Sequence, residues 1–293
     1  MKSEAKKILA FLLGLAFVFY YTMFGDLTDS YGDKSKLVTT DLKVYFIDVG
    51  QADSILISNS NFNMLIDAGN NEDGPKLVTY FKEELNIEKF DYVVGTHPHE
   101  DHIGGLDDII NNFKIDNILL PDATTTTKTF EDVLDTIANK KLEITIPEVN
   151  SEFNLGEAKL KVIYTGTDES DLNNTSIVLK MTFGNFSYLF TGDATSKTEN
   201  IILEKDIDVD ILKVGHHGSS YSSSELFLSK VTPKYAIISA GENNSYNHPT
   251  PETIERIKKH TNEIYTTNEL GTILLTSDGT NIKFDNFQTD TNG

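Results

Sequence analysis

Short apolar runs separated by polar or glycine-containing turns dominate the chain from residue 41 onward. Alternating and β-branched runs predict strands over 44–48, 54–58, 62–67, 90–95, 211–214, 235–239, 273–276 and 282–284. Residues 177–183 and 187–191 predict a hairpin around Gly184-Asn185. Helices are predicted over 76–85, 103–113 and 251–259, the last with Thr250 as its N-cap. This mixture indicates an α/β fold in which two sheets pack face to face with helices outside, an αββα four-layer sandwich.

The first 24 residues have a different pattern. Lys2, Lys6 and Lys7 precede an apolar run over 8–24, which is near the lower limit of about 17 residues for a membrane span. The lysines favour a cytoplasmic N-terminus, and the bulky end of the run shows no small-residue cleavage site. We interpret residues 1–24 as a signal anchor, with a cleaved signal peptide or a buried core helix as alternatives. Anchor and signal peptide both predict a catalytic domain outside the cytoplasmic membrane, either held there or secreted.

Polarity divides the rest of the chain. Residues 25–40 are polar and predict a tether, residues 41–285 carry the strand and helix patterns of one folded domain, and residues 286–293 form a polar tail. We therefore expect a single catalytic domain of 41–285 behind the N-terminal segment.

Composition restricts the chemistry. The 293 residues include no cysteine, so disulfides, thiolate metal ligands and a cysteine nucleophile are excluded. The net charge is −20, which disfavours non-specific capture of long nucleic acid. Arg256 is the only arginine, so phosphate recognition by paired arginine clamps is almost absent. Chemistry on a phosphate would rely on metal ions, backbone N–H groups and hydroxyl groups.

The segment Thr-His-Pro-His-Glu-Asp-His at 96–102 is the strongest chemical signal. It follows a predicted buried strand and precedes a helix. Because alternate residues of an extended segment point the same way, His97 and His99 can approach one cation, while Asp101 and His102 can reach a second. Imidazole and carboxylate suit zinc, and also manganese or iron. Two glycines directly afterwards, at 104 and 105, allow close backbone packing behind this segment.

Two later segments carry further candidates. Asp193 ends a strand in a Thr-Gly-Asp turn, and a carboxylate there can bridge two cations roughly 3.5–4 Å apart. His216 and His217 follow another buried strand. One of them should complete the second metal site, and the other would contact substrate or protonate a leaving group. Next to them, the N–H and hydroxyl groups around Ser219 could donate to a bound oxyanion.

These segments resemble a known family. The 96–102 motif resembles the HxHxDH signature of the metallo-β-lactamase superfamily. Together the segments resemble the metallo-β-lactamase-like domain of ComEC-type DNA-uptake proteins over residues 41–285. The segments are Phe-Ile-Asp-Val-Gly-Gln-Ala-Asp (46–53), Asn-Asn-Thr-Ser (173–176), Thr-Gly-Asp (191–193), Val-Gly-His-His-Gly-Ser (214–219) and Asn-His-Pro (247–249). The chain departs from that family at Ala52, where glycine is usual. It also lacks the channel-forming region, so transport is not implied.

The resemblance implies roles for individual residues. It favours His217 over His216 as the ligand, makes Asp193 the bridge and makes Asp67 a group that orients a ligand, with Asp48 in a similar part. His248 is expected at the mouth of the cleft, facing substrate. The metal ligands expected together are His97, His99, Asp101, His102, Asp193 and His217.

One expected ligand is missing from the pattern. Many superfamily members place a histidine before the Thr-Gly-Asp turn, where this chain has Asn173 and Asn174. Amide oxygen is a weaker ligand than imidazole, so the first metal is expected to be held less tightly.

The function predicted from these features is metal-dependent hydrolysis outside the cytoplasmic membrane. Two divalent cations, with zinc as the first expectation and manganese or iron as alternatives, would lower the pKa of a shared water toward about 7 and generate hydroxide. Asp101, Asp193 and His216 are the predicted catalytic residues. A phosphodiester, with DNA as the leading case, is the predicted substrate. The alternatives are a phosphorylcholine or cell-wall phosphoester and an inactive binding protein on the same fold. The sequence identifies no protein partner.

Overall fold

The computed structural model describes residues 40–167 and 170–287. The expected signal segment (1–24), the tether up to residue 39 and the tail from residue 288 lie outside these ranges, so those interpretations stay predictions. Within the described ranges, no helix combines the length and the apolar character needed to cross a membrane.

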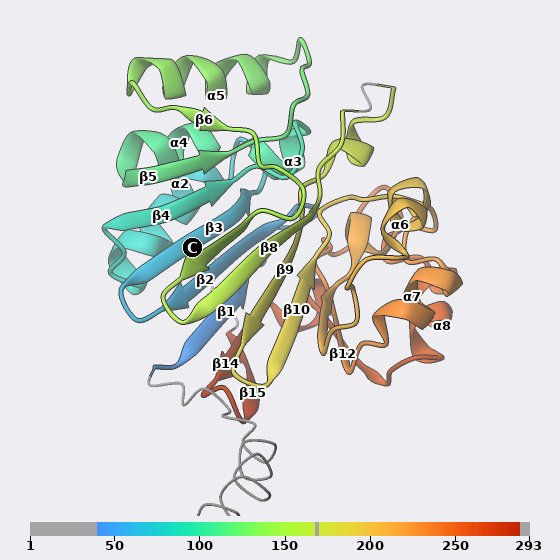
Figure 1. Ribbon diagram of the computed structural model, residues 1–293. Coiled ribbons are helices and arrows are strands. Elements are labelled where there is room, and N and C mark those ends of the chain that lie inside the picture. Colours follow the sequence, from blue (N-terminus) through green and yellow to red (C-terminus); the bar gives the residue numbers. More distant parts are fainter. Residues whose placement is uncertain (1–39, 168–169, 288–293) are drawn as a thin grey trace, which may run out of the picture. The chain divides into compact units, whose positions relative to one another are not determined.

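The strands form two sheets (Figure 1). The first sheet contains β1 (Leu42–Phe46), β2 (Ser54–Asn59), β3 (Phe62–Ala68), β4 (Lys89–Val94), β5 (Lys114–Leu119), β6 (Ile144–Thr145), β14 (Thr272–Ser277) and β15 (Ile282–Phe287). The second sheet contains β7 (Glu152–Leu155), β8 (Ala158–Tyr164), β9 (Val178–Phe183), β10 (Phe186–Phe190), β11 (Ile211–Lys213), β12 (Tyr235–Ile238) and β13 (Glu263–Thr266). Their orders are β15-β14-β1-β2-β3-β4-β5-β6 and β13-β12-β11-β10-β9-β8-β7.

Both sheets are mixed. Hairpins join β2 to β3, β9 to β10 and β14 to β15 in antiparallel pairs. By contrast, β3 to β6 run parallel to one another, as do β10 to β13. Parallel neighbours need crossover connections, and the helices supply them. The loops that follow the carboxyl ends of β4 and β11 are therefore free to carry functional side chains.

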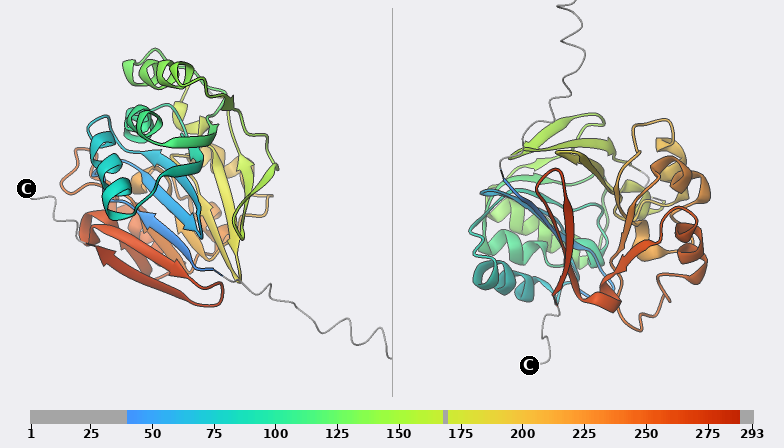
Figure 2. Two further views of the ribbon diagram at one scale, coloured as in Figure 1. Left: turned by 90° about the vertical axis from the view of Figure 1, so that its left-hand side faces the viewer. Right: turned by 90° about the horizontal axis from the view of Figure 1, so that it is seen from below.

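Helices cover the outer face of each sheet (Figure 2). Those in the first half are α2 (Gly74–Thr79), the π-helical turn η1 (Tyr80–Glu84), α3 (Glu100–Ile103), α4 (Leu106–Asn112) and α5 (Lys128–Asn139). Those in the second half are the short 3₁₀ turns η2 (Leu172–Thr175) and η3 (Gly215–Gly218), with α6 (Ser196–Ile202), α7 (Glu225–Val231), α8 (Pro251–Lys258) and α9 (Thr267–Leu270).

Three apolar clusters correspond to the three interfaces of a four-layer sandwich. Alternate residues of β1 face opposite ways, so that Phe46 packs between the two sheets and Tyr45 packs toward the helices of the first half. The second sheet divides in the same way, with Leu189 of β10 packing against Phe227 of α7. Each layer is thus held to the next by apolar side chains buried at their interface. This confirms the predicted αββα arrangement.

The predicted hairpin, the strands and the helix behind Thr250 are confirmed within a few residues. Thr250 caps α8 by accepting a hydrogen bond from the backbone N of Thr253 at 3.3 Å. Two helix predictions need correction. The helix expected over 76–85 is α-helical only through Thr79 and continues as η1, and the helix expected over 103–113 is two helices, α3 and α4.

The break between α3 and α4 lies at Gly104 and Gly105, where the backbone of the loop after β3 approaches closely. A Cβ on Gly104 would lie 2.3 Å from the carbonyl carbon of Asn70, and one on Gly105 would lie 2.5 Å from the carbonyl oxygen of Ala68. Only glycine allows this approach. The double glycine therefore fixes α3 against the carboxyl end of β3, as expected from the sequence.

A buried ion pair joins the two sheets. Lys213 Nζ, at the end of β11, lies 2.7 Å from Asp53 Oδ2, directly before β2, and both side chains are almost completely buried. Lys213 Nζ also donates to the carbonyl oxygen of Val214. No motif in the sequence around Lys213 indicates this pair, because Asp53 lies far away along the chain.

Removal of one partner of this pair should be costly. Lys213→Met leaves the Asp53 carboxylate buried without a counter-charge, so we expect the free energy of unfolding to fall by about 3–5 kcal/mol. Urea unfolding followed by circular dichroism measures this. The matched control is Lys234→Met, because Lys234 is exposed and its pair with Asp210 lies at the surface, where such pairs contribute about 1 kcal/mol or less. Equal losses in the two variants would contradict a structural role for the buried pair.

The double variant separates charge from packing. Asp53→Leu combined with Lys213→Met replaces both charges by apolar side chains, and buried ion pairs replaced in this way often lose little stability. We expect the double variant to be more stable than Lys213→Met alone.

Candidate active site

The loop after β4 brings three histidines to one edge of the first sheet. Thr96 and His97 leave the strand, and His99 is the N-cap of α3. His97 Nε2 lies 3.0 Å from His99 Nδ1, so both nitrogens face the same point. His102, on α3, is fully buried and lies with its ring centroid 4.1 Å from that of His97.

Asp67 fixes the orientation of His102. This aspartate ends β3 with a φ of +60°, a left-handed conformation that is uncommon for a residue other than glycine. Its carboxylate accepts hydrogen bonds from the backbone N and the hydroxyl of Thr96, both at 2.7 Å, and lies 2.8 Å from His102 Nδ1. With Nδ1 engaged in this way, His102 presents Nε2 to the centre of the site. The structure thus places Asp67 in the orienting position that the resemblance implied.

Asp193 lies at the turn after β10, between the loops of the two sheets. Its Oδ1 is 3.3 Å from His102 Nε2, and its Oδ2 is 3.6 Å from His217 Nε2 and 3.7 Å from His216 Nε2. The two carboxylate oxygens therefore face different imidazoles at the centre of the site.

The two neighbouring histidines after β11 point in different directions. His216 and His217 have φ values of +51° and +53°, and this left-handed turn separates their side chains. His217 Nδ1 lies 3.0 Å from the carbonyl oxygen of Ser239, so its Nε2 is left facing Asp101 Oδ2 at 3.3 Å. His216 is 22% exposed, whereas His217 is almost completely buried, and both line the pocket. The two imidazoles therefore have different surroundings.

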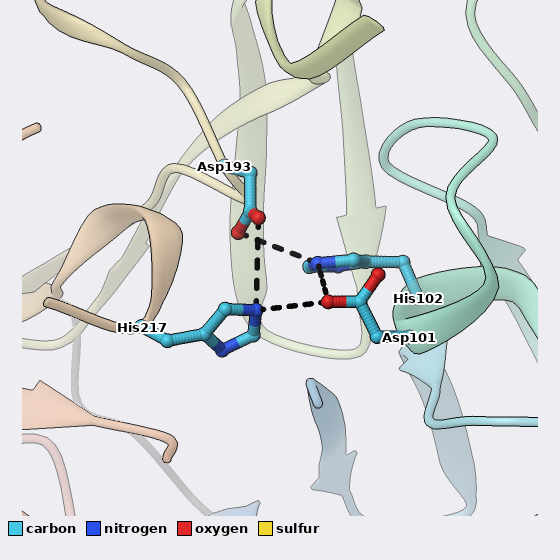
Figure 3. A group of neighbouring side chains, drawn as sticks. All are labelled: Asp101, His102, Asp193 and His217. Carbon is cyan, nitrogen blue, oxygen red and sulfur yellow. Dashed lines mark ion pairs between the residues drawn. The ribbon is translucent and has the colours of Figure 1, made fainter. Parts of the chain in front are cut away.

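Asp101, His102, Asp193 and His217 form a group that could hold a metal ion (Figure 3). One ligand atom of each lies within 4.8 Å of those of the others. His102 Nε2, His217 Nε2 and Asp193 Oδ1 are buried, and none has a hydrogen-bond partner among the described residues. Buried polar atoms are nearly always paired, and a divalent cation at their common centre would satisfy all three. The residues therefore fit a metal such as zinc, manganese or iron.

The electrostatics agree with this fit. Burial by itself would lower the pKa of His102, but the carboxylates of Asp193, Asp101 and Asp67 hold it well above its usual value. The same negative charge would attract a metal cation in place of a proton. Burial, reinforced by His102, holds the pKa of His97 well below its usual value, which keeps this imidazole neutral and its lone pair available.

Asn173 and Asn174, at the place of the expected extra histidine, have different surroundings. Asn174 is held by protein contacts: its Oδ1 accepts from the hydroxyls of Thr195 and Thr198 at 2.6 and 3.1 Å. Asn173 lines the pocket, and its buried Oδ1 has no partner among the described residues. Asn173 is therefore the one of the two asparagines that lies at the pocket, which His99 also lines.

A pocket of about 370 Å³ opens beside the group. It is lined by Gln51, His99, Glu100, Asp101, Asn173, Asp193, His216, His217, Tyr246 and His248. His248 thus lies at the pocket, as expected, and burial together with His216 and His217 lowers its pKa to about 4. Gln51, Glu100 and Tyr246 were not singled out by the sequence. Tyr246 lies two positions before His248, and this proximity was the signal that could have identified it.

Two predicted residues do not reach the pocket. Ser219 is buried, its hydroxyl oxygen accepts from the backbone N of Tyr221 at 3.3 Å, and it does not line the cavity. Asp48 is exposed and accepts from the backbone N of Gly50 at 3.1 Å, which stabilises the turn after β1. The structure therefore does not bring Ser219 and Asp48 together with the other predicted residues.

Comparison with known proteins finds curated relatives that are longer than this chain. The chain is 28% identical to ComE operon protein 3 of Bacillus subtilis over 256 residues, which are 80% of this chain and 33% of that protein. It is 30% identical to competence protein ComA of Neisseria gonorrhoeae over 216 residues, 73% of this chain and 29% of that protein. Recombination protein 2 of Haemophilus influenzae is 28% identical over 227 residues, 75% of this chain and 27% of that protein. The chain thus spans about a third of the length of these relatives.

Solved structures share the fold at low identity. The metallo-beta-lactamase fold protein YhfI from Bacillus subtilis superposes with a TM-score of 0.53 at 12% identity, covering 78% of this chain and 95% of that one. The diiron beta-hydroxylase CmlA from Streptomyces venezuelae has a TM-score of 0.53 at 13% identity, covering 85% of this chain and 54% of that one. The family model of the metallo-beta-lactamase superfamily matches residues 47–242, which include both histidine segments and Asp193, and the chain belongs to this superfamily.

Proposed function

We propose that the chain is a divalent-metal-dependent phosphodiesterase that acts on a DNA strand. The observation that carries the proposal is the group of buried ligand atoms without hydrogen-bond partners at the wall of the pocket. The names of two relatives, a competence protein and a recombination protein, support DNA as the substrate. An inactive binding protein would have no reason to keep these charged groups buried together, because such burial is costly.

The ligands divide into two sets in this proposal. His97 and His99 would hold one cation, with Asn173 nearby, and Asp101, His102 and His217 would hold the other. Asp193 would contact both, as the resemblance implies. Its two oxygens face His102 and His217 of the second set. Divalent cations bound there supply Lewis-acid activation of a water molecule and of the phosphoryl oxygen.

The chain's own residues complete the mechanism. Asp67 holds the His102 ring in place through Nδ1, and the carbonyl oxygen of Ser239 does the same for His217. His216 lies at the pocket with Nε2 toward Asp193, and we propose that it delivers a proton to the leaving oxygen. His248, with its pKa at about 4, is neutral at pH 7 and would hydrogen-bond to a phosphoryl oxygen.

A small phosphoester is the second candidate. The net charge of −20 and the single arginine favour a substrate whose recognition needs few phosphate contacts outside the metal centre. Esters of phosphorylcholine or of a cell-wall polymer fit this description.

The decisive experiment compares these substrates on one preparation. The full chain, loaded with zinc or with manganese, is assayed against a DNA oligonucleotide, bis-p-nitrophenyl phosphate and p-nitrophenyl phosphorylcholine. We expect hydrolysis of DNA and of bis-p-nitrophenyl phosphate, with the higher kcat/KM for DNA. Higher kcat/KM for the phosphorylcholine ester would favour the second candidate, and no hydrolysis of any substrate by metal-loaded protein would contradict both.

The variant Asp193→Asn tests the candidate metal centre in the same assay. The amide keeps the shape but removes the charge that would bind two cations, so we expect a loss of at least about 100-fold in kcat together with loss of bound metal. Asp132→Asn on the surface of α5 is the matched control, because its carboxylate pairs only with Lys128 there. Retention of both metals and of near-normal turnover by Asp193→Asn would show that Asp193 is not the bridge.

We also propose that the domain lies outside the cytoplasmic membrane. The support is the apolar run over 8–24 behind three lysines, and the membrane is then the expected partner of that segment. Full-length protein should fractionate with membranes and be cleaved by protease added to spheroplasts. A protease-protected soluble pool would contradict this location.

A further inference from the structure

Tyr246 is a large aromatic residue exposed at the edge of the pocket. The residue is 66% exposed. It lies in the loop between β12 and α8, which also carries His248. The phosphodiesterase proposal gives this ring no part. An exposed aromatic face beside a catalytic pocket is a feature of sites that bind planar groups.

The ring is backed by a second one. Tyr246 and His248 stack with ring centroids 5.7 Å apart and an interplanar angle of 26°. His248 in turn meets the ring of His216 edge-on, with centroids 5.7 Å apart. The rings therefore form a series that leads from the candidate metal centre to the surface, and Tyr246 is its outermost member.

The loop holds this series in place before any ligand arrives. Asn244 Oδ1 accepts from the backbone N of Tyr246 at 3.2 Å and from that of His248 at 3.0 Å. Asn244 Nδ2 donates to the carbonyl oxygens of Gly241 and His248. One half-buried amide thus ties both aromatic residues to the end of β12, so that little ordering entropy is lost when a ligand stacks on Tyr246.

A second cavity of about 720 Å³ continues from the same loop. His248 lines both cavities, and the second is also lined by Asn243, Asn247 and Lys258. Its other lining residues are largely uncharged, which suits hydrogen bonding to a sugar or a base better than it suits a second phosphate. The second cavity therefore offers a chain molecule a further concave surface on the other side of His248.

We propose that Tyr246, backed by His248, is a stacking platform for the nucleobase adjacent to the scissile phosphate. This inference rests on the proposed phosphodiesterase function and adds the part of the substrate that the metal centre does not contact. Stacking requires an unpaired base, so the substrate is a single strand, and it tolerates different bases because every base has a π-face. With so few cations near the pocket, stacking replaces charge as the source of affinity for the strand.

A quaternary ammonium group could also bind an aromatic ring by a cation–π contact. Such groups are usually enclosed by several aromatic residues, whereas Tyr246 is the only tyrosine, phenylalanine or tryptophan among the described residues that line the pocket. We therefore favour the base, and the ammonium group becomes an outcome of the test.

The test uses the metal-loaded full chain and three variants. Tyr246→Leu removes the aromatic face, and Tyr246→Phe keeps it. Tyr221→Leu is the matched control, because Tyr221 is 74% exposed and does not line the pocket. The substrates are a single-stranded oligonucleotide, the same oligonucleotide with abasic sites around the cleaved bond, and p-nitrophenyl phosphorylcholine. Quenching of 2-aminopurine in a bound oligonucleotide, recorded before turnover, measures stacking directly.

We expect Tyr246→Leu to raise KM for the oligonucleotide roughly 10-fold with little change in kcat, because stacking binds ground state and transition state alike. Tyr246→Phe and Tyr221→Leu should behave as the wild type, the abasic strand should be insensitive to Tyr246→Leu, and 2-aminopurine quenching should be lost in that variant. Bound metal should not change.

Three results would overturn the platform. The first is an unchanged KM and unchanged quenching in Tyr246→Leu while the oligonucleotide is still hydrolysed, which leaves the phosphodiesterase proposal intact. The second is a rise in KM confined to p-nitrophenyl phosphorylcholine, which assigns the ring to an ammonium group. The third is no hydrolysis and no quenching with wild-type protein, which removes the proposed function together with the platform.

Discussion

Charge buried at the junction of the two sheets is the constraint on which the rest of this structure depends. Asp193 and Asp67 are almost fully buried there, beside the buried imidazoles of His97, His102 and His217. Ionised carboxylates in an apolar interior are stable only when positive charge faces them. The protein supplies a fixed cation at Lys213, which is already paired with Asp53. The remaining negative charge needs another cation, and the ligand atoms without hydrogen-bond partners show where it would lie.

The surrounding fold serves to bring these groups together. The segments at the carboxyl ends of β3, β4, β10 and β11 deliver the side chains of the site, and all four strands bury side chains on both faces. Close packing at Gly104 and Gly105 sets α3 against β3, so that His102 meets Asp67. The left-handed turn at His216 and His217 then points the two neighbouring imidazoles in different directions. Such uncommon backbone conformations at a cluster of charged groups are typical of functional sites.

Much of this could be predicted from the sequence, because the information is local. The histidine segment after a β-branched run, the Thr-Gly-Asp turn and the Gly184-Asn185 hairpin are each defined by residues close together in the chain. Long-range contacts were not visible. The pairing of Lys213 could not be predicted because its partner Asp53 lies 160 positions away. Ser219 was predicted to be a donor because nothing local showed that its backbone turn directs it inward. Tyr246 was overlooked because an aromatic residue in a polar loop shows no periodicity, and its place beside the pocket depends on the Asn244 contacts.

Metal binding by the unmodified protein tests the central claim most directly. The full chain, purified in detergent, is exchanged into metal-free buffer, analysed for bound metals, then stripped with a chelator and followed by thermal unfolding as zinc or manganese is returned. The account predicts that about two divalent cations per chain are retained, that stripping lowers Tm because buried carboxylates lose their counter-charge, and that either cation restores it. Protein that retains no divalent cation, and whose Tm is unchanged by chelation and by added metal, would contradict it.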